Sequence, residues 1–166
     1  YQVERPDDAK AEAKEAFSTP VLYEHDGKTQ LLVTGGDCIT GHDPETGKEI
    51  WRWGTWNPDK IGHWRLVPSP VAGKGIALAC APKGAPIYAV KLGSNGNLDN
   101  SHIAWKSTNP NVSTDVPTPL FYRGHFYVAN NGRKRTHTLS CIEPESGKVI
   151  WSEDLGVEGK IEASPT

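Results

Sequence analysis

The amino-acid sequence repeats itself with a period of about 50 residues. The segment Gly41–Trp51 (GHDPETGKEIW) recurs, with conservative changes, as Cys141–Trp151 (CIEPESGKVIW). A second marker, a Ser or Thr followed by Pro, ends at Pro20, Pro70, Pro119 and Pro165. Successive prolines of this marker are therefore 50, 49 and 46 residues apart. Two independent markers that share one period indicate a repeat array, in which each repeat is one structural unit that packs on the next.

Within each period the pattern predicts four short strands, because apolar runs of four to eight residues alternate with turn signals rich in Gly and Asp. The expected strands cover 20–23, 30–34, 38–42 and 49–53 in the first unit, 70–72, 76–80, 87–91 and 102–106 in the second, and 119–122, 125–129, 136–142 and 148–152 in the third. Four antiparallel strands per unit are typical of a β-propeller blade. A β-sandwich does not show a long fixed period, and the strand-like turns exclude a helical solenoid. We therefore predict an all-β fold, a propeller of four-stranded antiparallel blades.

The chain is predicted to hold about three complete blades and part of a fourth. We expect blades at residues 18–53, 68–106 and 117–152 and the start of another at 161–166. Residues 1–17 are expected to hold the end of a preceding blade and a short connecting helix. Propellers have typically four to eight blades, so we expect the remaining blades from the same or another chain. The first residue is Tyr1 and the chain contains no Met, which favours a processed or excised segment without its signal peptide.

Composition excludes several classes of function. The 166 residues carry 18 basic and 20 acidic side chains, a formal net charge of −2, which gives no electrostatic basis for nucleic-acid binding. The longest purely apolar run, Ile76–Ala81, is far shorter than a membrane span. Three cysteines without CxxC spacing predict neither a disulfide scaffold nor a zinc site.

The repeated motif resembles the tryptophan-docking motif of the PQQ-like (quinoprotein-type) propeller repeats, which include the BamB-like proteins. The resemblance implies that an indole packs between blades, that the residue facing it is small, and that a carboxylate and a Gly shape the turn. The second blade departs from the pattern, because Lys91 replaces the acid and a polar insertion fills 92–101. The resemblance also implies a ring of seven or eight blades and export to the periplasm or the cell exterior. The predicted docking residues are Gly41, Asp43, Gly47, Trp51, Ala89, Trp105, Cys141, Glu143, Gly147 and Trp151.

One face of the propeller is the expected place for a ligand. The loops that lead into each innermost strand share this channel face with the loops between the second and third strands, and loops on a rigid scaffold commonly carry binding residues. Trp64 and Arg65 can stack on and pair with a planar anionic ligand, or they can cover the blade edge while Arg65 meets a neighbouring acid. The basic run at 133–135 adds three cations to this face, but such a short run is more typical of a solvated loop tip. The candidate ligand-binding residues are His63, Trp64, Arg65, Asp115, Asn130, Arg133 and Glu162.

No metal site is predicted. His42 and Asp43 lie near Cys38 in sequence, but alternation along a strand places His42 and Asp43 on opposite faces. The Gly41–Lys48 segment resembles a phosphate loop only superficially, because Glu49 stands where Ser or Thr is needed.

The predicted function is that of a non-catalytic binding or scaffold propeller with a protein or small-molecule ligand on its channel face and no cofactor. The alternative implied by the resemblance is part of a quinoprotein dehydrogenase that uses PQQ with Ca²⁺, a catalytic Asp and an adjacent pair of cysteines. This chain has no adjacent cysteines. A third possibility is another enzyme class, such as a hydrolase, that uses the channel. Fold alone does not decide between these functions.

Overall fold

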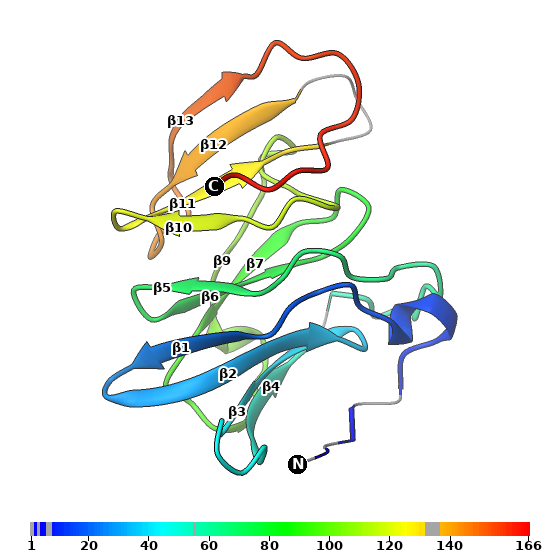
Figure 1. Ribbon diagram of the computed structural model, residues 1–166, viewed down its shortest axis with the longest axis vertical. Helices are drawn as coiled ribbons and strands as arrows, with labels where there is room; N and C mark the ends of the chain where they lie inside the picture. The colour runs from blue at the N-terminus through cyan, green and yellow to red at the C-terminus, as the bar shows by residue number, and fades with distance from the viewer. Residues whose placement is uncertain (1, 3, 6–7, 55, 132–136) are drawn as a thin grey trace.

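A computed structural model describes the chain except for residues 1, 3, 6–7, 55 and 132–136 (Figure 1). Three antiparallel sheets follow one another along the sequence, and we call them blades 1, 2 and 3. Blade 1 contains β1 (Val21–His25), β2 (Lys28–Gly35), β3 (Cys38–His42) and β4 (Glu49–Trp53). Blade 2 contains β5 (Val71–Gly73), β6 (Ile76–Cys80), β7 (Ile87–Lys91) and β9 (Ile103–Lys106), and blade 3 contains β10 (Leu120–Tyr122), β11 (His125–Ala129), β12 (Thr138–Ile142) and β13 (Val149–Asp154). The all-β, propeller-type fold predicted from the repeat is confirmed.

Two apolar cores hold the three blades together, one between each pair of neighbours. Between blades 1 and 2, Trp53 and Trp51 are fully buried, and blade 2 presents small residues to them. This pairing of large indoles with alanines lets the two sheets approach closely while much apolar area leaves water. These alanines are Ala77, Ala79 and Ala81. The second core is aliphatic and aromatic, and at its centre lie Leu78, Ile87, Phe126, Val128 and Ile142.

The Ser/Thr-Pro marker forms a ladder of hydrogen bonds between blades, which we call the marker ladder. The backbone N–H of Thr19 donates to Oγ of Ser69 at 2.9 Å, and the N–H of Ser69 donates to Oγ1 of Thr118 at 3.0 Å. The N–H of Thr118 in turn donates to Oγ of Ser164 at 2.9 Å. Each marker residue therefore ties its own blade to the next one, and this role needs a hydroxyl acceptor at every repeat.

The polar insertion of blade 2 adds a strand that the sequence pattern did not predict. β8 (Gly96–Asn97) pairs in parallel with β4 and extends blade 1 to five strands. After it, the N–H of Leu98 donates to the carbonyl of Arg52 at 2.8 Å, and the Leu98 side chain is buried in the first core. A two-residue strand has too little apolar alternation to be recognised from sequence.

The segment before blade 1 differs from the expected connecting helix. Within the described residues it forms one 3₁₀ turn, Ala11–Lys14, and a second short 3₁₀ turn, Asn100–His102, precedes β9. The first turn is held by tertiary contact, because Ala13 is buried and its N–H donates to the carbonyl of Gly62 at 3.0 Å. The preceding strand end expected at 1–5 falls partly on residues outside the described ones, as does residue 136 of the expected strand 136–142. No helix in the described part of the chain is long and apolar enough to cross a membrane.

Candidate functional site

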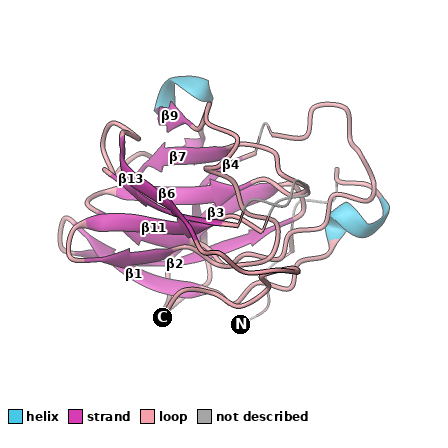
Figure 2. Cartoon of the chain, turned by 90° about the horizontal axis from the view of Figure 1, so that it is seen from above, coloured by secondary structure: helices cyan, strands magenta, loops and turns pink. Residues whose placement is uncertain are grey.

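The loops of the predicted channel face lie together at one end of the blades. Figure 1 shows the β2–β3 and β6–β7 loops and the connections between blades at the right-hand end of the stack, and Figure 2 shows the same end from above. Hydrogen bonds join the two kinds of loop. Nδ2 of Asn57 donates to Oδ2 of Asp37 at 2.9 Å, and the N–H of Lys83 donates to Oδ1 of Asp115 at 2.7 Å. These loops therefore form one cross-linked surface.

A cavity of about 830 Å³ opens on this surface among the loops of blades 2 and 3 and the segment that follows β13. Its volume lies within the range of small-molecule and cofactor sites. Most of the lining residues have polar side chains, and among them are Lys83, Ser113, Asp115, Asn131, His137 and Glu162. The structure thus brings Asp115 and Glu162, two of the predicted ligand-binding residues, to the wall of one cavity.

Asp115 is fixed by its neighbours. Besides the bond from the Lys83 main chain, its Oδ2 lies 3.8 Å from Nζ of Lys83, and its own N–H donates to Oδ1 of Asn131 at 2.9 Å. Asp115 therefore connects the loops of blades 2 and 3, through its carboxylate on the Lys83 side and through its main-chain N–H on the Asn131 side. The charge of the carboxylate is partly compensated by the Lys83 ammonium group.

His137 is one of several polar residues of this cavity that were not among the predicted candidates. His137 is only 6% exposed, and neither Nδ1 nor Nε2 has a hydrogen-bond partner among the described residues. A buried polar group without a partner costs about 1–3 kcal/mol of stability. The residue stands just before β12, where its carbonyl accepts a bond from the N–H of Leu155 at 2.7 Å. A lone His beside a basic loop carries no sequence signal that would have distinguished it.

The other candidate ligand-binding residues lie elsewhere. Trp64 packs against the first core, whereas His63 and Arg65 are exposed. Nη1 of Arg65 lies 3.4 Å from Oε2 of Glu12, and its guanidinium is 5.4 Å from the centre of the Phe17 ring. These contacts agree with the second of the two interpretations, in which Trp64 covers the blade edge and Arg65 meets a neighbouring acid.

Asn130 and Arg133 complete the set of candidates. Asn130 is buried beside the cavity, and its Nδ2 donates to the carbonyl of Pro110 at 3.0 Å. Arg133 lies outside the described residues.

The three motif tryptophans have three different surroundings. Trp51 is 1% exposed, and its Nε1 donates to Oε1 of Gln30 at 2.7 Å. Trp105 of blade 2 reaches the turn of blade 3, where its Nε1 donates to the carbonyl of Pro144 at 2.6 Å. Trp151 is 38% exposed and lies 6.1 Å from the Tyr127 ring. A shared docking role for all three stays a prediction.

Small residues face these indoles, as packing requires. In the strand register Gly41 lies opposite Trp51, Ala89 opposite Trp105 and Cys141 opposite Trp151. A Cβ added at Gly41 would overlap the indole of Trp51.

The motif turns are shaped by their carboxylates. Oδ1 of Asp43 accepts bonds from the N–H groups of Thr46 and Glu45 and from Oγ1 of Thr46, all at 2.8–2.9 Å. These bonds, chiefly the one from the Thr46 main chain, lower the pKa of Asp43. Glu143 repeats the arrangement with Ser146, whose bonds lower the pKa of that carboxyl. Gly47 and Gly147 follow with φ of 74° and 71°, the left-handed conformation that favours glycine.

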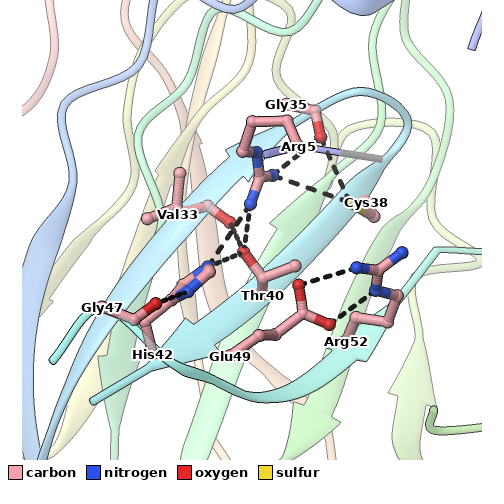
Figure 3. Close-up of polar contacts among 9 residues, drawn as sticks. All are labelled: Arg5, Val33, Gly35, Cys38, Thr40, His42, Gly47, Glu49 and Arg52. Carbon is pink, nitrogen blue, oxygen red and sulfur yellow. Dashed lines mark hydrogen bonds and ion pairs between the residues drawn. The ribbon is translucent and has the colours of Figure 1, made fainter. Parts of the chain in front are cut away.

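A network of hydrogen bonds links Arg5 to side chains of β3 (Figure 3). Nη1 of Arg5 donates to Oγ1 of Thr40 at 2.6 Å, and Nη2 donates to the carbonyl of Gly35 at 3.0 Å. His42 lies 2.9 Å from Oγ1 of Thr40 and 3.1 Å from the Gly47 carbonyl, so both its ring nitrogens have partners. Cys38 is buried there, and desolvation raises the pKa of its thiol to about 11. Among the described residues no group of three or more potential ligands is placed to hold a metal ion.

The remaining thiols are buried as well. Burial raises the pKa of Cys80 to about 12, which keeps it protonated near neutral pH. Cys141 is free and buried at the small position facing Trp151.

Comparison with known proteins gives one family and several relatives. A family model described as outer membrane protein assembly factor BamB matches residues 38–166. Tetrathionate hydrolase of Acidithiobacillus ferrooxidans is 24% identical over 160 residues, which cover 90% of this chain and 29% of that protein. The chain therefore spans less than a third of the length of this relative.

Solved structures share the fold at low sequence identity. BamB from Moraxella catarrhalis matches with a TM-score of 0.54 and 12% identity, covering 89% of this chain and 39% of that one. A quinohemoprotein alcohol dehydrogenase from Pseudomonas putida matches with a TM-score of 0.59 and 16% identity, covering 86% of this chain and 21% of that one. A europium-containing methanol dehydrogenase matches with a TM-score of 0.55 and 14% identity, covering 83% of this chain and 26% of that one. At these identities the similarity concerns the propeller fold alone.

Proposed function

This chain belongs to the family of the outer membrane protein assembly factor BamB, and from that membership we propose that it is a non-catalytic binding module. It acts in the periplasm or at the cell surface and presents its channel-face loops to a protein or small ligand. The remaining blades of its ring come from the same or another chain.

The observation that carries this proposal is the cavity between the loops of blades 2 and 3. Its wall combines hydrogen-bonding side chains with two valines, Val116 and Val157, on loops that the blades hold in place. Residues of the repeated motif, in contrast, make structural contacts. Trp105 donates a hydrogen bond to the turn of the neighbouring blade, and Asp43 accepts hydrogen bonds within its own turn. Motif and cavity are thus separate, which suits a scaffold with a binding face.

The second candidate is an enzyme, favoured by the fold shared with two dehydrogenases and by the relative named tetrathionate hydrolase. Carboxylates at Asp115, Glu158 and Glu162 are the donors that Ca²⁺ prefers. Asp115 is already bound to Lys83, however, and the described lining contains no Trp, Tyr or Phe ring on which a planar quinone would stack. The described residues therefore fit the PQQ and Ca²⁺ pair incompletely.

The test titrates the full-length protein with PQQ in the presence of Ca²⁺ and records its absorption spectrum and alcohol-dependent dye reduction. A parallel assay measures tetrathionate hydrolysis. We expect no saturable spectral change, no dye reduction and no hydrolysis. A saturable quinone complex that oxidises alcohol would replace the binding module with the dehydrogenase, and tetrathionate turnover would replace it with a hydrolase.

A further inference from the structure

The imidazole of His137 has no hydrogen-bond partner among the described residues. The ring is buried on the wall of the cavity, and its backbone is held by the bond from Leu155. A neutral imidazole offers one donor and one acceptor. Within the described part of the chain both are unused, although buried polar groups in folded proteins are nearly always hydrogen-bonded. A ligand that brings an acceptor and a donor would satisfy this ring.

The charges around the cavity argue against a strongly charged ligand. Lys83 is paired with Asp115, so the charges left on the described wall are Glu158, Lys160 and Glu162. These exposed side chains mix both signs, and neither sign forms a cluster that would attract an anion or a cation alone. The neutral groups Ser113 and Asn131 contribute further donors and acceptors.

The rim of the cavity offers main-chain groups as well. The segment 157–163, which supplies Val157, Glu158, Gly159, Lys160 and Glu162 to the wall, makes no main-chain hydrogen bond within the described part of the chain. An unpaired stretch of backbone can pair with an extended peptide as one strand pairs with another.

We propose that the cavity at His137 binds an extended, uncharged segment of polypeptide, whose main-chain N–H and C=O groups meet the His137 ring and the 157–163 backbone. A peptide supplies donor and acceptor at regular spacing, and its side chains find Val116 and Val157 beside the polar wall. This inference rests on the binding function proposed above and names the ligand class of that site.

The test observes the ring resonances of His137 in full-length protein labelled with ¹⁵N-histidine, assigned by their loss in His137→Gln. The probe is the blocked, uncharged peptide acetyl-Ala-Ser-Gly-Ser-Ala-amide. Its counterpart carries methyl groups on the central amide nitrogens, and inorganic phosphate and glucose serve as alternative ligands. We expect saturable shifts with the first peptide and affinity about tenfold weaker for the methylated one, a loss equivalent to roughly one good hydrogen bond.

Variants separate binding from folding. In peptide-observed titrations we expect His137→Leu to weaken binding about tenfold while its urea midpoint stays the same or rises, because two unpaired buried nitrogens are removed. His137→Gln keeps a donor and an acceptor and should retain binding. The matched control is His125→Gln, since His125 lies at the start of β11 and bonds locally to the carbonyl of Arg123.

Each remaining result contradicts the inference. Absence of peptide binding, equal affinity for the methylated peptide, or unchanged binding by His137→Leu would overturn it. A stronger response to phosphate or glucose would overturn the ligand class and leave the binding module standing. Only quinone-dependent oxidation or tetrathionate turnover, measured in the separate assays, would overturn the proposed function itself.

Discussion

At the scale of single residues, equivalent positions in the repeat do not have equivalent surroundings. Trp51 and Trp151 occupy the same place in the motif, yet the first is 1% exposed and the second 38%. Trp51 lies between blades 1 and 2 and binds Gln30, whereas Trp151 lies on the outward side of blade 3. Burial on both sides, rather than the motif alone, determines what an indole contributes.

We expect Trp51→Ala to lower the free energy of unfolding by about 3–5 kcal/mol, since it leaves a cavity and strips Gln30 of its partner. Trp151→Ala in the same chain should cost less than half as much, because its indole is already partly in water. Urea denaturation followed by circular dichroism measures both values. A loss below about 1 kcal/mol for Trp51→Ala would contradict its packing role.

At the scale of elements, the carboxylates of the motif turns contribute to the acid sensitivity of the fold. The folded-state pKa values of Asp43 and Glu143 lie below the ordinary values of 3.8 and 4.5, because the turns donate hydrogen bonds to the ionised forms. The stabilisation is therefore fully present above the unfolded pKa values and is lost as the pH falls through the folded ones.

We expect the urea midpoint to drop between about pH 5 and about pH 2, and to drop less in the double variant Asp43→Asn, Glu143→Gln. Asp59→Asn is the control, since Asp59 is exposed and has no hydrogen bond in the described structure. If the double variant keeps the full acid dependence, the turn carboxylates are not its source.

We also expect the hydrogen bonds of the marker ladder to stabilise the folded chain. Thr118→Val removes the acceptor of the Ser69 N–H at nearly constant volume and should lower the free energy of unfolding by about 1 kcal/mol. Ser69→Ala should cost less, because Thr19, whose N–H it frees, is exposed to water. Thermal denaturation compares both with Thr108→Val, an exposed Thr outside the ladder. Equal melting temperatures for all three variants would show that the ladder adds no stability.

At the scale of the whole molecule, the three blades leave apolar surface beyond blade 3. Large apolar side chains of blade 3 remain between 38% and 52% exposed, and they are Tyr122, Ile150 and Trp151. Exposed patches of this kind mark surfaces that associate. Between blades 1 and 2 and between blades 2 and 3, the corresponding surfaces are buried in the two cores.

We therefore expect this 166-residue chain on its own to self-associate as its concentration rises, which sedimentation velocity measures directly. Trp151→Lys should shift the equilibrium toward monomer by placing a charge on that side of the sheet. Lys106→Ala, at an exposed outer-strand position of blade 2, should leave it unchanged. Monomer at every concentration would mean that the exposed side chains do not form an associating surface.

How far the sequence predicts the structure varies with the range of the interactions. β3, β6 and β11 begin and end at the expected residues, because alternation and glycine turns are local signals. β8 escaped prediction because Gly96 and Asn97 are strand only by pairing with Trp51 and Arg52. Asp115 and Glu162 could be assigned to the channel face from their place in the repeat, but that place does not show whether a side chain finds a partner.

The sequence alone determined the blade, its period and the face on which the loops gather, because each of these follows from spacing along the chain. Only the tertiary structure decided that Ser69 and Thr118 connect blades, that Arg5 bonds to β3, and that His137 is buried with no partner among the residues that the structure describes. The reason is physical: burial and hydrogen bonding are properties of a side chain's neighbours, and most of these neighbours are brought close only when the sheets stack.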